Sequence, residues 1–178
     1  IDLGTATVLV YDSVKGLLIK EPSVVAVDAS TGEVLKVGEE AFKMIGRTPD
    51  RIRALYPLKD GVISDFDQTE QMLRHFLKKA SESTLSKPRV CICVPSGITG
   101  VESRACVNAA VSAGARKVYL IEEPVAAALG AGLDLSVPRG RFILDMGGGT
   151  TDIAVLSLNG IVCKKSIKLA GRKLDEAI

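Results

Sequence analysis

The chain has 178 residues, of which 47% are hydrophobic and 25% charged, the composition of an ordinary globular protein with a substantial core. A net charge of +2 and an aromatic content of 4%, with no Trp, argue against a nucleic-acid-binding surface. The most apolar uncharged segment, residues 124–133, is about half as long as a membrane span, so no membrane-spanning helix is predicted.

The four cysteines are predicted to be core thiols. Cys91 and Cys93 alternate within an apolar strand pattern and therefore share a face, and no second pair or histidine cluster completes a zinc site. Free thiols of this kind suit a reducing cytoplasm, and the sequence has no signal-peptide pattern. Because the chain starts inside a strand pattern at Ile1 and stops inside a helix pattern at Ile178, we expect it to be a piece of a longer protein.

The N-terminal segment reads as a series of strands. Asp2, Gly4 and Thr5 come directly before a strand-like run over residues 7–11. Two further runs, over residues 17–20 and 23–27, follow through short links. Short links between successive strands predict a meander of three neighbouring strands, antiparallel or mixed.

A more polar and basic segment follows at residues 30–59. It contains a short strand pattern over 33–37, a short helix pattern over 39–45, and a loop with arginines at positions 47, 51 and 53. We predict a small inserted subdomain whose arginines form a solvated face, with a binding patch as the alternative.

An amphipathic helix is predicted next. Asp67 with Glu70 three residues later gives a helix-start signal. One apolar stripe runs along the helix, formed by Met72, Leu73, Phe76, Leu77 and Ala80. His75, the only histidine, falls off this stripe, which indicates a surface residue rather than a catalytic one. The polar connection after this helix carries one apolar residue, Leu85.

Residues 89–121 predict a strand, a helix and a parallel strand. The first strand pattern covers residues 89–94, and Thr99 with Glu102 forms a capping-box signature for a helix of small residues that ends near Gly114. The second strand covers residues 117–121, and the length of the connection favours parallel pairing. Another helix should begin at Glu123-Pro124, since Pro is favoured at the first helical position.

Residues 142–158 predict a strand, a tight turn and a second strand. Asp145 closes the first strand, and the glycines at positions 147, 148 and 149 form the turn. Glycines let backbone N–H groups approach an anion closely and adopt left-handed angles at little cost. Phosphate is the obvious anion, and a carboxylate beside it calls for a divalent cation such as Mg²⁺. The turn therefore predicts a Mg²⁺-nucleotide site, with a ligand-free hairpin as the alternative for this stretch taken singly.

The same order of residue types occurs at the start of the chain, where Asp2 is followed by Gly4, Thr5 and a strand. This internal echo implies two related halves, each offering a phosphate-facing hairpin to a shared cleft. The sequence contains no Gly-x-x-x-x-Gly-Lys-Ser/Thr pattern, so it is not a P-loop protein.

These residues together resemble the actin-like ATPase superfamily. Within it, six segments are similar to the MreB family of bacterial actins: EPSVVA (21–26), GRTP (46–49), KDGVI (59–63), VPSGIT (94–99), AGAR (113–116) and LIEEP (120–124). The resemblance covers essentially the whole chain. It implies an α/β fold of the actin-like (ribonuclease H-like) type, a mixed sheet flanked by helices, with the first half complete and the second half only begun.

The resemblance also implies a division into subdomains. Residues 1–29 and 60–140 would form the first large subdomain (IA), residues 30–59 the small inserted one (IB), and residues 141–178 the truncated beginning of the second large one (IIA). The adenosine-binding motif of the family would lie beyond residue 178.

The resemblance implies roles for particular residues. Asp2 and Asp145 would hold Mg²⁺ through water, and Glu123 would orient or deprotonate the attacking water with help from the Thr150 hydroxyl. The phosphates of ATP would be bound at the two hairpins by Gly4, Thr5, Ala6, Thr7, Gly147, Gly148, Gly149 and Thr150. From the residues alone, Glu123 is better explained as a carboxylate that stabilises the first turn of its helix, and Asp152 as a supporting polar residue than as a ligand.

Two residues depart from the family pattern. Thr7 stands where the family commonly has Asn, and Arg172 stands where an acidic residue is usual. The first change affects a phosphate-side contact, and the second affects a polar contact near the start of the last helix.

The implied function is that of an ATP-binding and ATP-hydrolysing actin-like protein that forms membrane-associated filaments and directs rod cell shape. Its expected partners are further copies of itself, the inner face of the cytoplasmic membrane, and cell-wall elongation proteins of the MreC, MreD, RodZ and RodA type, with no nucleic acid. The alternative is another ATPase or phosphotransferase of the same fold, such as a DnaK-type chaperone or a sugar kinase.

Overall fold

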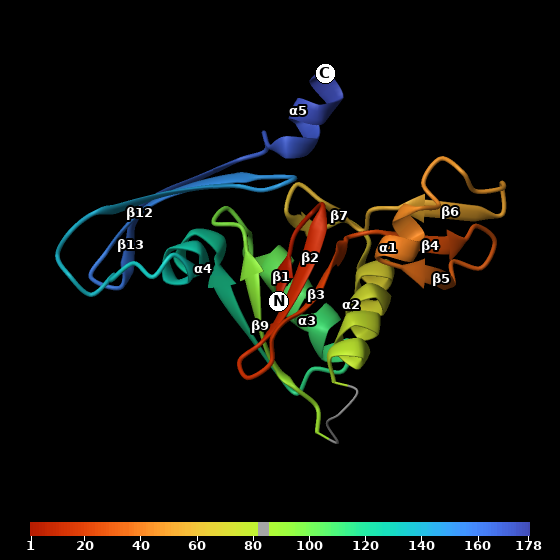
Figure 1. The fold of residues 1–178 in the computed structure, drawn as a ribbon, viewed down its shortest axis with the longest axis horizontal. Coiled ribbons are helices and arrows are strands. Elements are labelled where there is room, and N and C mark those ends of the chain that lie inside the picture. The colour runs from red at the N-terminus through yellow and green to blue at the C-terminus, as the bar shows by residue number, and fades with distance from the viewer. Residues whose placement is uncertain (82–85) are drawn as a thin grey trace.

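The structure, a computed structural model, describes residues 1–81 and 86–178 (Figure 1). Its largest sheet has five strands in the order β10-β9-β1-β2-β3. These are β1 (Asp2–Leu3), β2 (Thr7–Asp12), β3 (Gly16–Pro22), β9 (Arg89–Val94) and β10 (Lys117–Glu122). β10, β9 and β1 run parallel, whereas β1, β2 and β3 are antiparallel, so the predicted mixed sheet is confirmed.

Two helices pack on this sheet, α2 (Phe66–Ala80) and α3 (Gly100–Ser112). The predicted apolar stripe of α2 packs in the main core, where Phe76 is fully covered and only Ala80 is partly exposed, and His75 is exposed. The capping box of α3 forms as predicted between Thr99 and Glu102. The start of α2 was predicted wrongly, because the cap is Asp65, whose side chain accepts a hydrogen bond from the Gln68 N–H at 3.0 Å.

The predicted meander is wrong in its third strand. β4 (Val25–Asp28) does not pair with β3 and instead lies between β5 (Val34–Val37) and β6 (Ile52–Leu55) in a separate three-stranded sheet. Residues 25–28 thus belong with the small inserted unit rather than with the large sheet. β6 was expected as loop, and the helix α1 (Glu39–Phe42) is shorter than its predicted range.

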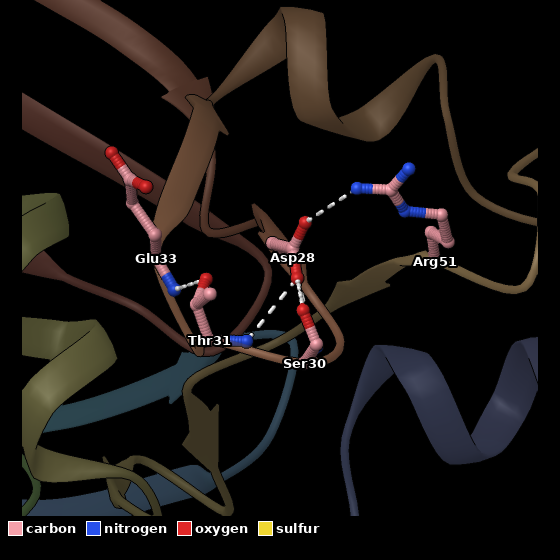
Figure 2. Close-up of polar contacts among 5 residues, drawn as sticks. All are labelled: Asp28, Ser30, Thr31, Glu33 and Arg51. Carbon is pink, nitrogen blue, oxygen red and sulfur yellow. Dashed lines mark hydrogen bonds and ion pairs between the residues drawn. The ribbon is translucent and has the colours of Figure 1, made fainter.

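A polar turn joins β4 to β5 in this small unit (Figure 2). Asp28 Oδ1 accepts hydrogen bonds from the N–H groups of Ser30 and Thr31 at 2.8 and 3.2 Å, and the Glu33 N–H donates to Thr31 Oγ1 at 3.2 Å. Arg51 reaches Asp28 Oδ2 at 3.9 Å while its side chain stays 86% exposed. Such an exposed contact contributes little to stability, and it leaves Arg51 on the solvated face predicted for it.

The second half of the chain forms another three-stranded sheet, β11-β12-β13. Its elements are β11 (Arg141–Met146), β12 (Thr151–Ser157), β13 (Gly160–Ile167) and the terminal helix α5 (Gly171–Ala177). α4 (Glu123–Gly130) contacts both this sheet and strands β9 and β10, and Ala128 packs with Ala154 and Leu156. Figure 1 shows α4 below the long β12–β13 ribbon, with α5 at its far end.

Two strands, β7 (Leu58–Lys59) and β8 (Val62–Ile63), form a hairpin that leads from the small unit into α2. The connection that carries Leu85 lies partly outside the described residues. No helix in the described part of the chain is long and apolar enough to cross a membrane.

The cysteines differ from the prediction. Cys106 is buried and Cys93 is half-buried, whereas Cys91 and Cys163 are exposed. Cys91 shares a sheet face with Cys93, as predicted, but this face is not fully covered along β9. The prediction of core thiols is therefore wrong for Cys91 and Cys163.

Candidate functional site

A cavity of about 300 Å³ lies where the two predicted phosphate-facing hairpins meet. It is lined by Asp2, Gly4, Thr5, Ala6, Thr7, Gly61, Cys93, Glu123, Ala126, Ala127, Asp145, Gly147, Gly148, Gly149 and Thr150. The structure thus brings together all the residues that the sequence assigned to this site, although they come from both halves of the chain.

Sheet register explains how the acidic groups converge. Asp2 pairs with Cys93 across β1 and β9, and Cys93 pairs with Ile121 across β9 and β10. The carboxyl ends of these parallel strands are therefore level, and Glu123 begins α4 just beyond β10. Ligands of open α/β sheets bind outside the carboxyl ends of the strands, and the cavity lies at this edge.

The first hairpin turns tightly between β1 and β2. A Cβ on Gly4 would lie 2.7 Å from the carbonyl oxygen of Thr7, so only glycine fits there. The Gly4 carbonyl accepts a hydrogen bond from Ser23 Oγ at 2.5 Å. Thr5 is buried, and its Oγ1 accepts a hydrogen bond from the Gly61 N–H at 2.8 Å. These contacts fix the turn at the wall of the cavity.

The second hairpin uses its glycines differently from the prediction. None of the three has a positive φ angle, so the expected left-handed angles are wrong. Instead, a Cβ on Gly148 would lie 2.6 Å from Ala6 Cβ, and one on Gly149 would lie 2.3 Å from Thr5 Oγ1. These two glycines are required because the two hairpins touch each other.

Carboxylates from both halves act on one another around the cavity. Burial, followed by the charges of Asp152, Asp2 and Asp145, raises the pKa of Glu123 to about 8. Burial and the charge of Asp145 raise the pKa of Asp2, and burial with the charge of Asp152 raises the pKa of Asp145. Concentrated negative charge of this kind is stabilised by a cation.

Asp152 ties the second half to the first. It is fully buried, and its Oδ1 accepts a hydrogen bond from the Ser96 N–H at 2.7 Å. Its Oδ2 has no hydrogen-bond partner among the described residues. Asp152 does not line the cavity, and its contact with Ser96 agrees with the supporting role considered for it.

The side chains around the cavity could supply only part of the ligands of a Mg²⁺ ion. Among the described residues no cluster of three or more His, Cys, Asp or Glu side chains forms a complete protein cage. Mg²⁺ normally keeps several waters and takes one or two carboxylates together with phosphate oxygens. Asp2 and Asp145 supply such a pair on opposite hairpins, so the residues fit a metal that arrives with a phosphate ligand.

Sequence reasoning missed four residues of the lining. Gly61 follows Asp60 in a turn, and its own φ angle is 76°. The turn brings the Gly61 N–H against Thr5. Cys93 is level with Asp2, which only the strand register reveals, and Ala126 and Ala127 lie one turn beyond Glu123 on α4. The Asp60-Gly61 dipeptide is a turn signal that points to Gly61, and the spacing of a helix that begins at Glu123 points to Ala126 and Ala127.

The fold and the site define an α/β protein of the actin-like class, in which two related hairpins face a common cavity. The family described as MreB/Mbl protein matches residues 1–178, and the chain belongs to this family. It is 55% identical over 179 residues to the cell shape-determining protein Mbl of Bacillus subtilis, and 50% identical over 184 residues to the cell shape-determining protein MreB of Escherichia coli.

These alignments include the whole chain but only 54% and 53% of the two relatives, so the chain spans about half of their length. Among solved structures, MreB5 of Spiroplasma citri bound to ADP is 40% identical with a TM-score of 0.90, covering 98% of this chain and 53% of that one. The MamK double helical filament is 25% identical with a TM-score of 0.79, covering 98% and 55%.

Proposed function

We propose that this chain contributes the phosphate-binding part of an ATP site in an actin-like ATPase. The observation that carries the proposal is the contact of two glycine turns beside the cavity, with an aspartate at the base of each. Backbone N–H groups at Gly4, Thr5 and residues 148–150 are the donors we assign to the β- and γ-phosphates, because preorganised amides stabilise developing phosphate charge. The relatives solved with ADP and with AMPPNP support this assignment. The Gly147 N–H, also expected to bind phosphate, instead donates to the Thr150 carbonyl at 2.9 Å.

We assign the metal-facing positions to Asp2 and Asp145. Bound Mg²⁺ would supply the positive charge that neutralises the phosphate oxygens and these carboxylates. Asp2 is held on a strand with neighbours on both sides, and Asp145 pairs with Asp152 in the register of β11 and β12. Their backbones are therefore fixed on opposite walls of the cavity before any ligand enters.

Glu123 is the group we assign to the attacking water, with help from the Thr150 hydroxyl, which lines the same cavity from the other half. A general base is most effective when its pKa lies near the working pH, and the pKa of Glu123 is raised from 4.5 to about 8. The carboxyl can thus hold or release a proton near neutral pH. This property distinguishes Glu123 from an ordinary carboxylate in the first turn of a helix.

In the complete protein we propose that nucleotide state controls filament assembly at the inner face of the cytoplasmic membrane, and that these filaments organise cell-wall synthesis. The proposed partners are further copies of the protein, the membrane surface, and elongation proteins of the MreC, MreD, RodZ and RodA type. Support comes from the names of the cell shape-determining relatives and from the MamK filament.

The decisive experiment uses Glu123→Ala in the complete protein. ATP-Mg²⁺ affinity, measured by titration calorimetry, should stay nearly unchanged, because the phosphate-binding amides remain. Phosphate release should slow at least about tenfold, since a positioned base typically contributes about 10²–10⁴ in rate. Glu122→Ala, which removes the neighbouring carboxylate paired with Lys164 at 2.8 Å, is the matched control.

Unchanged turnover in Glu123→Ala would remove Glu123 from the mechanism. Absence of ATP binding by the unmodified protein would remove the ATPase proposal itself. The 178-residue chain would be titrated with ATP-Mg²⁺ alongside the complete protein. Binding by both would mean that the two hairpins suffice. Binding by the complete protein alone would place the site between two complete halves.

A further inference from the structure

Arg172, near the start of α5, makes a contact between the two halves of the chain. Its guanidinium carbon lies 4.1 Å from the centre of the Tyr56 ring, within range of a cation–π interaction. Tyr56 lies between β6 and β7, where the chain leaves the small inserted sheet. The contact therefore joins the start of α5, in the second half, to the small unit in the first half.

The backbone of the same residue holds the triple-glycine turn. The Arg172 N–H donates a hydrogen bond to the Gly148 carbonyl at 3.0 Å, and the Gly171 N–H donates to the Gly147 carbonyl at 3.1 Å. In a trans peptide the N–H points opposite to the C=O. With both carbonyls turned toward α5, the N–H groups of Gly148 and Gly149 point away from α5. Gly171 and Arg172 together thus set the direction of two amides assigned to phosphate, and Arg172 sets that of Gly149.

The segment around Tyr56 also reaches the first hairpin. Asp60 lies 4.0 Å from Lys168, an exposed ion pair of little strength, and the neighbouring Gly61 N–H binds Thr5 Oγ1 at 2.8 Å. A second cavity of about 550 Å³ lies between these elements, and its lining includes Tyr56, Arg172 and both Gly148 and Gly149. A Cβ on Gly149 would lie 3.1 Å from the Gly61 nitrogen, so this short segment lies against both phosphate-facing turns.

We propose that Arg172 is a positioning residue that couples the triple-glycine turn to the small inserted unit by stacking on Tyr56. The side chain fixes α5 against the inserted unit, and the backbone transmits that position to the turn. The phosphate-facing part of this inference rests on the proposed function. Loss of the stacking should loosen the turn and shorten the time that a nucleotide stays bound.

The first test measures dissociation of a fluorescent ATP analogue with Mg²⁺ from the complete protein. Arg172→Ala and Tyr56→Leu should each speed dissociation about two- to fivefold, the range expected for a partly exposed cation–π contact. The double variant should be no faster than either single variant, because both remove one interaction. Tyr56→Phe keeps the ring and should behave like the unmodified protein.

Lys173→Ala is the matched control, because Lys173 is the next residue on α5 and lines the same second cavity. It should leave the dissociation rate unchanged. Arg172→Lys adds a finer distinction, since lysine keeps the charge but lacks the flat guanidinium that stacks on a ring. Equal rates for the unmodified protein, Arg172→Ala and Tyr56→Leu would overturn the proposal, as would additive effects in the double variant.

The second test needs no nucleotide. Amide hydrogen exchange at Gly147, Gly171 and Arg172, whose N–H groups donate hydrogen bonds at this junction, should speed up about two- to fivefold in Arg172→Ala and in Tyr56→Leu. Unchanged exchange in both variants would overturn the coupling. Faster exchange in a protein that fails to bind ATP would support the coupling while contradicting the proposed function, so the two failures can be told apart.

Discussion

Replacement of Glu123 by Gln should stabilise the nucleotide-free protein in a pH-dependent way. Gln keeps the shape of the side chain and removes its charge. In the folded protein the carboxyl has a pKa of about 8, whereas the ordinary value is 4.5. Between these two values the folded state binds more protons than the unfolded state, so stability falls as pH rises through this window. Above about pH 8 the full cost of the buried charge is present.

The size of this effect follows from the shift. Each unit of pKa corresponds to about 1.4 kcal/mol, so a shift from 4.5 to about 8 corresponds to a cost on the order of 5 kcal/mol above pH 8. Glu123→Gln should therefore raise the free energy of unfolding by several kcal/mol at pH 8.5. Near pH 4.5 the difference should be small, because Glu123 is protonated in the folded state and can form the same neutral contacts as Gln.

Urea unfolding at several pH values between 4.5 and 9, with a chelator to remove divalent cations, measures this difference. Glu122→Gln is the control, because it removes a partly exposed carboxylate whose pair with Lys164 is worth about 0–1 kcal/mol. The reasoning fails if Glu123→Gln and the unmodified protein show parallel stability profiles over the whole pH range.

Two further substitutions test the packing of the site. Gly149→Ala should destabilise the protein by about 1–3 kcal/mol and weaken ATP binding, because its Cβ would lie 2.3 Å from Thr5 Oγ1, whereas Gly130→Ala meets nothing within 4 Å and should be close to neutral in urea unfolding. Asp152→Ala should cost about 1–3 kcal/mol in thermal unfolding by leaving the buried Ser96 N–H unpaired, while Asp152→Asn keeps an acceptor oxygen and should cost less; equal losses would contradict this.

Much of the fold could be predicted because its signals are local. The β9 strand has the predicted limits, and the cap formed by Thr99 and Glu102 and the start of α4 at Glu123 depend on residues within one helical turn. The two hairpins could be found for the same reason. The residues of the site could be assigned together because the same residue order occurs at Asp2 and at Asp145, which predicts two related hairpins that face one cavity.

Three of the errors concern long-range placement. β4 has the alternation of a strand, but its partners are decided by β5 and β6, which lie on either side of it in the folded chain. The exposure of Cys91 depends on which face of β9 the helices cover, and alternation alone cannot choose the face. The need for glycine at position 149 comes from Thr5, more than 140 residues earlier, rather than from its own backbone angles.

The central place of β1 in the large sheet has a consequence for how the protein is made. The Cys93 N–H donates to the Ile1 carbonyl at 2.9 Å, a contact between residues 92 positions apart. At a synthesis rate of about 5–20 residues per second, the first strand waits roughly 5–20 s for this neighbour. During that time one side of β1 is an unpaired edge, the kind of surface on which misfolding begins. The strand that carries Asp2 is thus translated well before the neighbouring strand β9 that secures it.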